Sequence, residues 1–151
     1  MKKCAVKCRL ITVLLLSVVL MGCGESVTPD YSVVTDYGEV VRIASDNDEN
    51  TVLIDLRANR EYEAKHLIGA INVPYDEDGS WLLEYLRQNE LGDKSLYLMC
   101  GKGQKSADAF NLLVQEGYLD VHYVRFGFEE YAENEGEDAL EGAEICECYL
   151  E

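Results

Sequence analysis

The stretch Leu96-Tyr97-Leu98-Met99-Cys100-Gly101-Lys102-Gly103-Gln104-Lys105-Ser106 decides how this chain is organised. Its first four residues are apolar and predict a buried strand, and the two glycines after the cysteine predict a tight loop. A helix is expected from Ser106 to about Glu116, with Gly117 ending it. A strand, a glycine-bearing loop and a helix start together aim backbone N–H groups at a bound anion. The stretch therefore predicts an α/β unit with an anion site.

Cys100 is the candidate nucleophile of this unit. The helix N-terminus supplies roughly half a positive charge, and Lys102 and Lys105 add two full ones. Positive surroundings favour the thiolate, which is the nucleophilic form of cysteine. A cysteine at a strand end is also often a small buried hydrophobe. The strand end, paired glycines, two cations and helix start lie within a few positions, and this convergence favours a reactive centre.

A second informative stretch follows the apolar run at 51–54, which has the profile of a parallel strand buried on both faces. Asp55 and Arg57 are expected to pair near the carboxyl edge of the sheet as structural support. Asn59 is expected to cap the next helix. His66 is interpreted as a hydrogen-bonded structural residue rather than a catalytic base. A metal site at His66 is not favoured, because the sequence has no second ligand at a typical spacing from it.

Both stretches resemble the rhodanese-like sulfurtransferases. Residues 100–106, Cys-Gly-Lys-Gly-Gln-Lys-Ser, are similar to that family's active-site pattern Cys-x-x-Gly-x-Arg-Ser. Residues 55–74 are similar to its amino-terminal signature, with Asp-x-Arg, Glu-Tyr and Gly-Ala-x-Asn-x-Pro in order. Lys105 stands where the family often has arginine, so the charge is kept but the two-pronged hydrogen bonding is not. The resemblance implies a three-layer α/β/α sandwich with a five-stranded parallel sheet.

The resemblance also implies a function. Cys100 would attack a thiosulfate-like donor, become a persulfide and pass the sulfur to a thiol or cyanide, without a metal or organic cofactor. The sulfur anion would be bound by the loop residues, which are Gly101, Lys102, Gly103, Gln104, Lys105 and Ser106. One alternative is a persulfide carrier or interaction module that does not turn over. A second is a rhodanese-related phosphatase or arsenate reductase, whose loop has five residues between cysteine and arginine. This chain has four before Lys105.

The order of the elements agrees with that architecture. Strands are expected at 31–34, 51–54, 96–99 and 121–124, and helices at 36–44, 60–65, 81–89 and 106–116. Strands alternating with helices predict a mostly parallel sheet covered on both faces. Ligands of such sheets bind at the carboxyl ends of the strands. We assign the domain to 31–135 and an acidic, solvated tail to 136–151.

The composition restricts the partners. The net charge is −16, from 13 basic and 29 acidic residues, which argues against nucleic acid and against electrostatic docking on anionic lipid. From Glu133 onward the chain has eight acidic residues and no lysine or arginine. This tail contains Cys146-Glu147-Cys148, which is compatible with half a metal site, a redox pair, an acceptor of sulfur from Cys100, or no function.

The first 22 residues have the pattern of a secretory signal rather than of a folded domain. Four basic residues precede an apolar run at 10–21 that is too short to span a bilayer comfortably. Leu20-Met21-Gly22-Cys23 resembles a bacterial lipobox, in which the cysteine carries a diacylglyceryl group. We therefore expect a lipid anchor at Cys23, a short tether over 23–30, and a location at the extracytoplasmic face of the cell membrane.

A Cys23→Ala variant tests this expectation. Without the acylated cysteine, the chain loses its two acyl chains and should move from the membrane pellet to the soluble fraction. Fractionation followed by immunoblotting measures the shift. An unchanged pellet fraction would exclude lipidation at Cys23 as the anchor.

Overall fold

The computed structural model describes residues 28–46, 48–134 and 139–142. Its elements, in chain order, are β1 (Asp30–Val34), α1 (Tyr37–Ser45), β2 (Thr51–Asp55), α2 (Asn59–Ala64), β3 (His66–Leu67), β4 (Ile71–Asn72), α3 (Ser80–Gln88), β5 (Ser95–Met99), α4 (Gln104–Gln115), β6 (Asp120–Val124), α5 (Gly127–Asn134) and β7 (Leu140–Glu141). The expected signal segment 1–22, the lipobox Cys23, and Cys146 and Cys148 of the tail all lie outside the described residues.

Five strands form one parallel sheet in the order β1-β6-β5-β2-β4, which confirms the predicted α/β fold. Because every strand runs the same way, their carboxyl ends meet at one edge. Cys100 follows β5, the central strand of the sheet. Asp55 ends the neighbouring strand β2 and pairs in register with Met99. The fold therefore brings the two sequence stretches together at the carboxyl edge.

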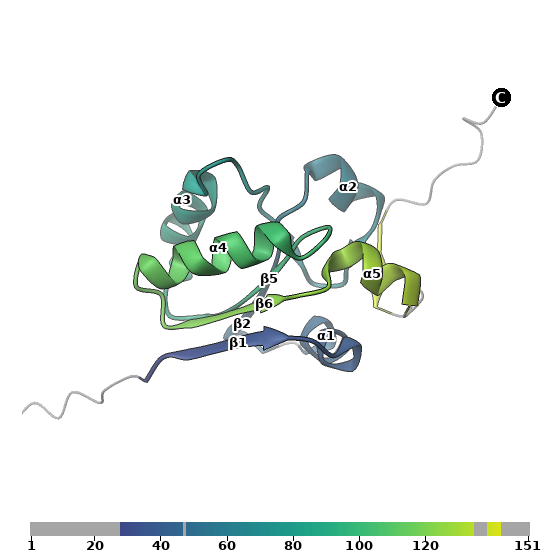
Figure 1. Cartoon of the computed structure of the whole chain (residues 1–151), viewed down its shortest axis with the longest axis horizontal. Coiled ribbons are helices and arrows are strands. Elements are labelled where there is room, and N and C mark those ends of the chain that lie inside the picture. The colour runs from purple at the N-terminus through teal and green to yellow at the C-terminus, as the bar shows by residue number, and fades with distance from the viewer. Residues whose placement is uncertain (1–27, 47, 135–138, 143–151) are drawn as a thin grey trace, which may run out of the picture.

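Helices cover both faces of the sheet and give it two hydrophobic cores (Figure 1). Successive residues of a strand point to opposite faces, so Leu53 and Ile54 of β2 enter different cores. One core lies under α1 and α5, and the other under α3 and α4. Cys100 belongs to the α3–α4 core. Helix α4, which follows the Cys100 loop in the chain, packs in the same core. None of the described helices has the length and apolar character needed to cross a bilayer.

Several local expectations need correction. Helix α4 begins at Gln104 rather than Ser106, because the left-handed Gly103 already ends the loop. Ala58, not Asn59, is the N-cap of α2, and the Glu61 carboxylate accepts from the Ala58 N–H at 3.1 Å. The spacing of Trp81, Leu82, Tyr85 and Leu86 predicts a single apolar face for α3, yet Trp81 is 68% exposed.

The expected start of the tail at 136 is also too early. Ala139 is buried, and Leu140 and Glu141 form β7, which pairs antiparallel with β3. The Ile68 N–H donates to the Ala139 carbonyl at 2.9 Å. The acidic composition suggested a solvated tail, but Ala139 and Leu140 attach this segment to the domain. The short strand β4 at the sheet edge was likewise not located from the sequence.

Candidate active site

Cys100 is the first residue after β5, and only 2% of it is exposed. Two neighbours on β5, Leu96 and Leu98, are completely buried in the same core and fix the strand that carries it. The Ser106 N–H donates to the Cys100 Sγ at 3.4 Å, and the Ser106 hydroxyl lies 3.4 Å from the same sulfur. Ser106 therefore contacts the thiol through its amide and its hydroxyl. The sequence pattern placed Ser106 in the loop but did not show these two contacts.

The first turn of helix α5 is hydrogen-bonded to the loop backbone. The first N–H groups of a helix have no partner within the helix. In α5 two of them are satisfied by the loop: Phe128 donates to the Cys100 carbonyl at 2.7 Å and Glu129 to the Gly101 carbonyl at 3.0 Å. Gly127 has φ +77, and a Cβ there would lie 2.5 Å from the Gly101 oxygen. Only glycine therefore permits this close approach.

Gly103 makes a second close approach. Its φ is +79, and a Cβ would lie 1.8 Å from the Arg125 carbonyl oxygen, which follows β6. The Ser106 hydroxyl lies within 3.1 Å of the Gly103 carbonyl and 3.3 Å of the Val124 carbonyl. The loop is thus fastened to the strand end beside it.

The backbone amides of the loop are its candidate donors to an anion. Within the described part of the chain, the N–H groups of residues 101–105 have no hydrogen-bond acceptor. The carbonyls of Cys100 and Gly101 are taken by α5, and the N-terminus of α4 adds its positive end. Free amides at a helix N-terminus bind anions well. The arrangement can therefore accept a negatively charged group next to a sulfur nucleophile.

A cavity of about 210 Å³ opens at this loop. It is lined by Arg57, Glu61, Cys100, Gly101, Lys102, Gln104 and Lys105. Its two lysines are exposed at the rim: Lys102 lies 3.5 Å from Glu129, and Lys105 donates to the Tyr75 carbonyl at 3.4 Å. Glu61 and Glu129 were not anticipated at the site, since the sequence does not show which acidic residues of α2 and α5 face the loop.

Arg57 is the buried cation of the site. Its guanidinium bonds both carboxylate oxygens of Asp55, the shortest contact being 2.7 Å, so the expected pair is present. It also donates to the Lys65 carbonyl at 2.7 Å and lies 3.5 Å above the Phe128 ring. Such a cation–π contact is strongest where water is excluded. Arg57 therefore joins β2, the α2–β3 segment and α5 while lining the thiol cavity.

His66 and Tyr62 support the segment after α2. The His66 Nδ1–H donates to the Tyr62 carbonyl at 2.7 Å, and the two rings stack 3.7 Å apart. The Tyr62 hydroxyl donates to the Ala70 carbonyl at 2.6 Å. Burial, with smaller contributions from the charges of Glu141 and Asp55, raises the pKa of Tyr62 above its ordinary 10.0, so the phenol stays protonated and donating. His66 thus has the structural surroundings predicted for it.

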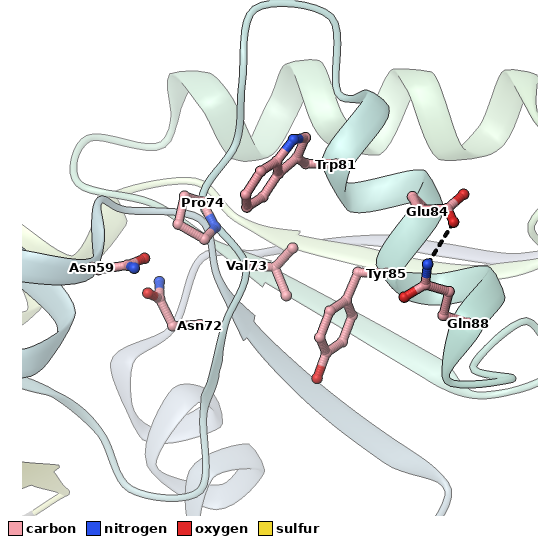
Figure 2. A pocket seen from close by; sticks show the side chains of 8 residues that line it. All are labelled: Asn59, Asn72, Val73, Pro74, Trp81, Glu84, Tyr85 and Gln88. Carbon is pink, nitrogen blue, oxygen red and sulfur yellow. Dashed lines mark hydrogen bonds between the residues drawn. The ribbon is translucent and has the colours of Figure 1, made fainter.

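A larger cavity of about 350 Å³ lies beside β4 and α3 (Figure 2). It is lined by Asn59, Asn72, Val73, Pro74, Trp81, Glu84, Tyr85 and Gln88. It shares no residue with the thiol cavity and has no cation among its lining side chains. The Asn72 amide donates to the Asp55 and Arg57 carbonyls, which accounts for the asparagine of the signature. The thiol and the cations that accompany it therefore lie in the smaller cavity.

His122 is the middle residue of β6 and does not line the thiol cavity. It is buried, contacts Ser32 at 2.7 Å and Asp120 at 2.6 Å, and stacks on Tyr97. Its ligand atoms and those of Asp30 and Asp120 lie within 4.8 Å of one another, a proximity that sequence spacing did not reveal for Asp30. The hydrogen bonds of His122 to Asp120 and Ser32 fix the imidazole in this cluster.

The fold and the site together define a class of protein: a parallel α/β domain with a buried thiol in a glycine-bearing loop at the carboxyl edge of the sheet. Residues 40–134 match the family model described as Rhodanese-like domain. The chain belongs to the rhodanese-like domain family, as its motifs indicated.

The chain is similar to curated proteins of different kinds. The chain is 27% identical over 95 residues to the thiosulfate sulfurtransferase GlpE of Pseudomonas syringae pv. syringae, covering 63% of this chain and 85% of that protein. It is 32% identical over 94 residues to the tRNA uridine(34) hydroxylase of Photorhabdus laumondii, covering 60% of this chain. The chain spans between about a quarter and a third of the length of these hydroxylases, from 24% to 35%.

Solved structures show the same fold. The single domain sulfurtransferase RDL2 of Saccharomyces cerevisiae has a TM-score of 0.59 at 20% identity, with 74% of this chain and 95% of that chain covered. The rhodanese-like domain of the Anabaena sp. Alr3790 protein also has a TM-score of 0.59, at 18% identity, covering 72% of this chain and 78% of that one.

Gly117 and Gly103 both have a positive φ, so alanine substitutions at the two positions distinguish backbone strain from steric overlap. Gly117→Ala should cost about 1–2 kcal/mol, since φ is +89 but nothing lies within 4 Å of the added Cβ. Gly103→Ala carries the same penalty and also overlaps the Arg125 carbonyl, so it should destabilise more and displace the loop. Urea unfolding and the rate of Cys100 alkylation measure both effects. Equal losses of stability in the two variants would contradict the close packing of Gly103.

Proposed function

We propose that the protein is a single-domain sulfurtransferase that forms a persulfide at Cys100. The observation that carries the proposal is that the N–H groups at 101–105 have no acceptor among the described residues and lie next to a cysteine in a cation-lined cavity. The first half-reaction starts with attack of the Cys100 thiolate on the sulfane sulfur of a thiosulfate-like donor. A Cys100 Sγ–S bond forms, the donor S–S bond breaks, and sulfite leaves with the electron pair.

The second half-reaction releases the sulfur. A thiophilic acceptor, such as cyanide or a thiolate, attacks the outer sulfur and forms a new bond to it. The Sγ–S bond breaks, and Cys100 regains the electron pair as a thiolate. The proposed roles of Gly101, Gly103 and Gln104 are to present their amides to the sulfur anion, with Ser106 placed at Sγ. Lys102 and Lys105 attract the anionic donor at the rim.

Three further alternatives are weighed against this reaction. A loop of four residues between Cys100 and Lys105 suits a persulfide better than a phosphoryl or arsenate group. The net charge of −16 opposes tRNA as a substrate, although hydroxylases acting on tRNA uridine share the domain. A carrier that takes up sulfur once and passes it to a partner uses the same first half-reaction. Whether the donor turns over separates the carrier from the enzyme.

We further propose that the protein works at the membrane surface through a lipid on Cys23. The lipobox-like residues 20–23 and the basic, then apolar, segment before them support this location. The site itself takes small anions, so an anchored domain could meet its sulfur donors and acceptors from solution.

Cys100→Ser tests the proposed function directly. The wild-type chain should gain one sulfur atom on Cys100 after exposure to thiosulfate and should turn over thiosulfate and cyanide with ping-pong kinetics. The serine variant should do neither, because its hydroxyl cannot form a persulfide. Intact-mass spectrometry and thiocyanate formation are the measurements. No sulfur on wild-type Cys100 would overturn the proposal, and uptake without turnover would favour the carrier.

Lys105→Ala should raise the KM for thiosulfate by up to about fivefold, since an exposed ionic contact contributes on the order of 1 kcal/mol or less. The effect should shrink as ionic strength rises. Lys94→Ala is the matched control, because Lys94 donates to the Glu49 carbonyl and does not line the thiol cavity. Steady-state kinetics at low and high salt measure both. Equal KM values for the two variants would remove Lys105 from donor binding.

A further inference from the structure

Trp81 is a large aromatic residue that the hydrophobic core does not use. It lies on α3, whose buried residues are Leu82, Leu83 and Leu86. Trp81 itself is 68% exposed and lines the cavity beside β4 and α3 (Figure 2). Half-buried Tyr85, one helical turn further along α3, lines the same cavity. Two aromatic rings at a cavity offer apolar contact surface to a ligand.

The cavity combines these rings with polar side chains. Its volume of about 350 Å³ lies within the range of about 300–1,000 Å³ that is typical for pockets of small organic ligands. The apolar part of the lining is completed by Val73 and Pro74 from the segment at the end of β4. A ligand that fits both parts has an apolar stem and a polar group. The polar lining residues are Asn59, Asn72, Glu84 and Gln88.

The charge of the lining indicates the sign of that polar group. The lining contains one carboxylate, Glu84, and no basic side chain. Glu84 lies three residues after Trp81 and therefore on the same face of α3. Its Oε1 accepts from the Gln88 amide at 2.6 Å, and its Oε2 has no hydrogen-bond or ion-pair partner among the described residues. The amide leaves the negative charge in place, so the second oxygen can face a cation.

Further carboxylates act on one end of the cavity. Tyr75 directly follows Pro74, which belongs to the lining. Burial raises the pKa of Tyr75 above its ordinary 10.0, and the negative charge of nearby carboxylates raises it further. In order of effect these carboxylates are Asp108, Asp76 and Asp78. They come from α4 and from the loop before α3, so negative charge approaches this end of the cavity from two elements and attracts cations.

We propose that this cavity binds an organic cation, that is, an ammonium or guanidinium group on an aliphatic stem. The cation lies over the Trp81 ring and faces the Glu84 carboxylate. Tryptophan is the side chain whose ring attracts cations most strongly. The aliphatic stem contacts Pro74 and Tyr85. The site shares no lining residue with the thiol cavity, so the inference does not depend on the reaction proposed for Cys100.

Fluorescence reports on this cavity alone, because Trp81 is the only tryptophan of the chain. Titration of the full chain with n-butylammonium chloride at constant ionic strength should give a saturable shift of the Trp81 emission maximum. Butanol and butyrate have the same number of carbon atoms without the positive charge, and neither should give a saturable shift. An equal response to butanol would overturn the assignment of a cation. The absence of a saturable response to n-butylammonium would overturn the site.

Two pairs of variants locate the contacts. Glu84→Gln should weaken n-butylammonium binding by about two- to fivefold, as expected for the loss of one exposed ion pair. Glu63→Gln is the matched control, because Glu63 is exposed on α2 and does not line the cavity. Equal dissociation constants for these two variants would overturn the assignment.

The second pair tests the ring by isothermal titration calorimetry. Trp81→Ala should weaken binding by about two- to fivefold, whereas Trp81→Phe should keep part of the affinity because phenylalanine still offers a ring face. Trp81 is exposed, so neither change removes a core contact. Equal affinities of the alanine variant and the wild type would overturn the proposal.

A peptide titration distinguishes the two sources of such a cation. A blocked pentaglycine peptide with a central lysine is compared with n-butylammonium and with its glutamine counterpart. Tighter binding of the lysine peptide would support the proposal and identify a polypeptide side chain as the ligand. Tighter binding of n-butylammonium would support it and identify a free amine. Equal binding of the glutamine and lysine peptides would overturn the requirement for a positive charge and with it the proposal.

Discussion

The structure depends on one contact above all, the donation of the first α5 amides to the carbonyls of Cys100 and Gly101. A helix start needs acceptors for its N–H groups, and a loop that is to bind an anion needs its carbonyls turned away from the ligand. One pair of hydrogen bonds meets both needs. Gly127 makes the contact possible, since any larger residue would collide with the loop backbone.

The same edge of the sheet also has to accommodate a buried charge. Arg57 would be costly in an apolar layer if it stood alone, because an unpaired buried charge loses its hydration without compensation. Asp55 neutralises it, the Lys65 carbonyl accepts another of its hydrogens, and the Phe128 ring covers its face. Arg57 can therefore remain at the cavity as a rigid cation, whereas the two lysines at the rim stay in contact with water.

The fold could be predicted because its signals are local. Apolar runs marked the strands, and the glycine loop between a strand and a helix marked the site. What could not be predicted depends on contacts between distant segments. Leu140 and Glu141 look like part of an acidic tail until β3 is placed beside them. Glu129 looks like any exposed helix residue until α5 docks on the loop next to Lys102. Periodicity likewise could not show that Trp81 lies outside the core.

The two cavities differ in the side chains that line them. The larger one, beside α3, has neither a cation nor a thiol in its lining, and an anion would have to lose water there without compensation. The smaller one combines free amides, Arg57 and two lysines around Cys100. Its position follows from the parallel sheet, because only the carboxyl edge gathers the end of β2, the loop after β5 and the start of α5 in one place. Sheet topology, rather than any single residue, therefore determines which cavity contains Cys100.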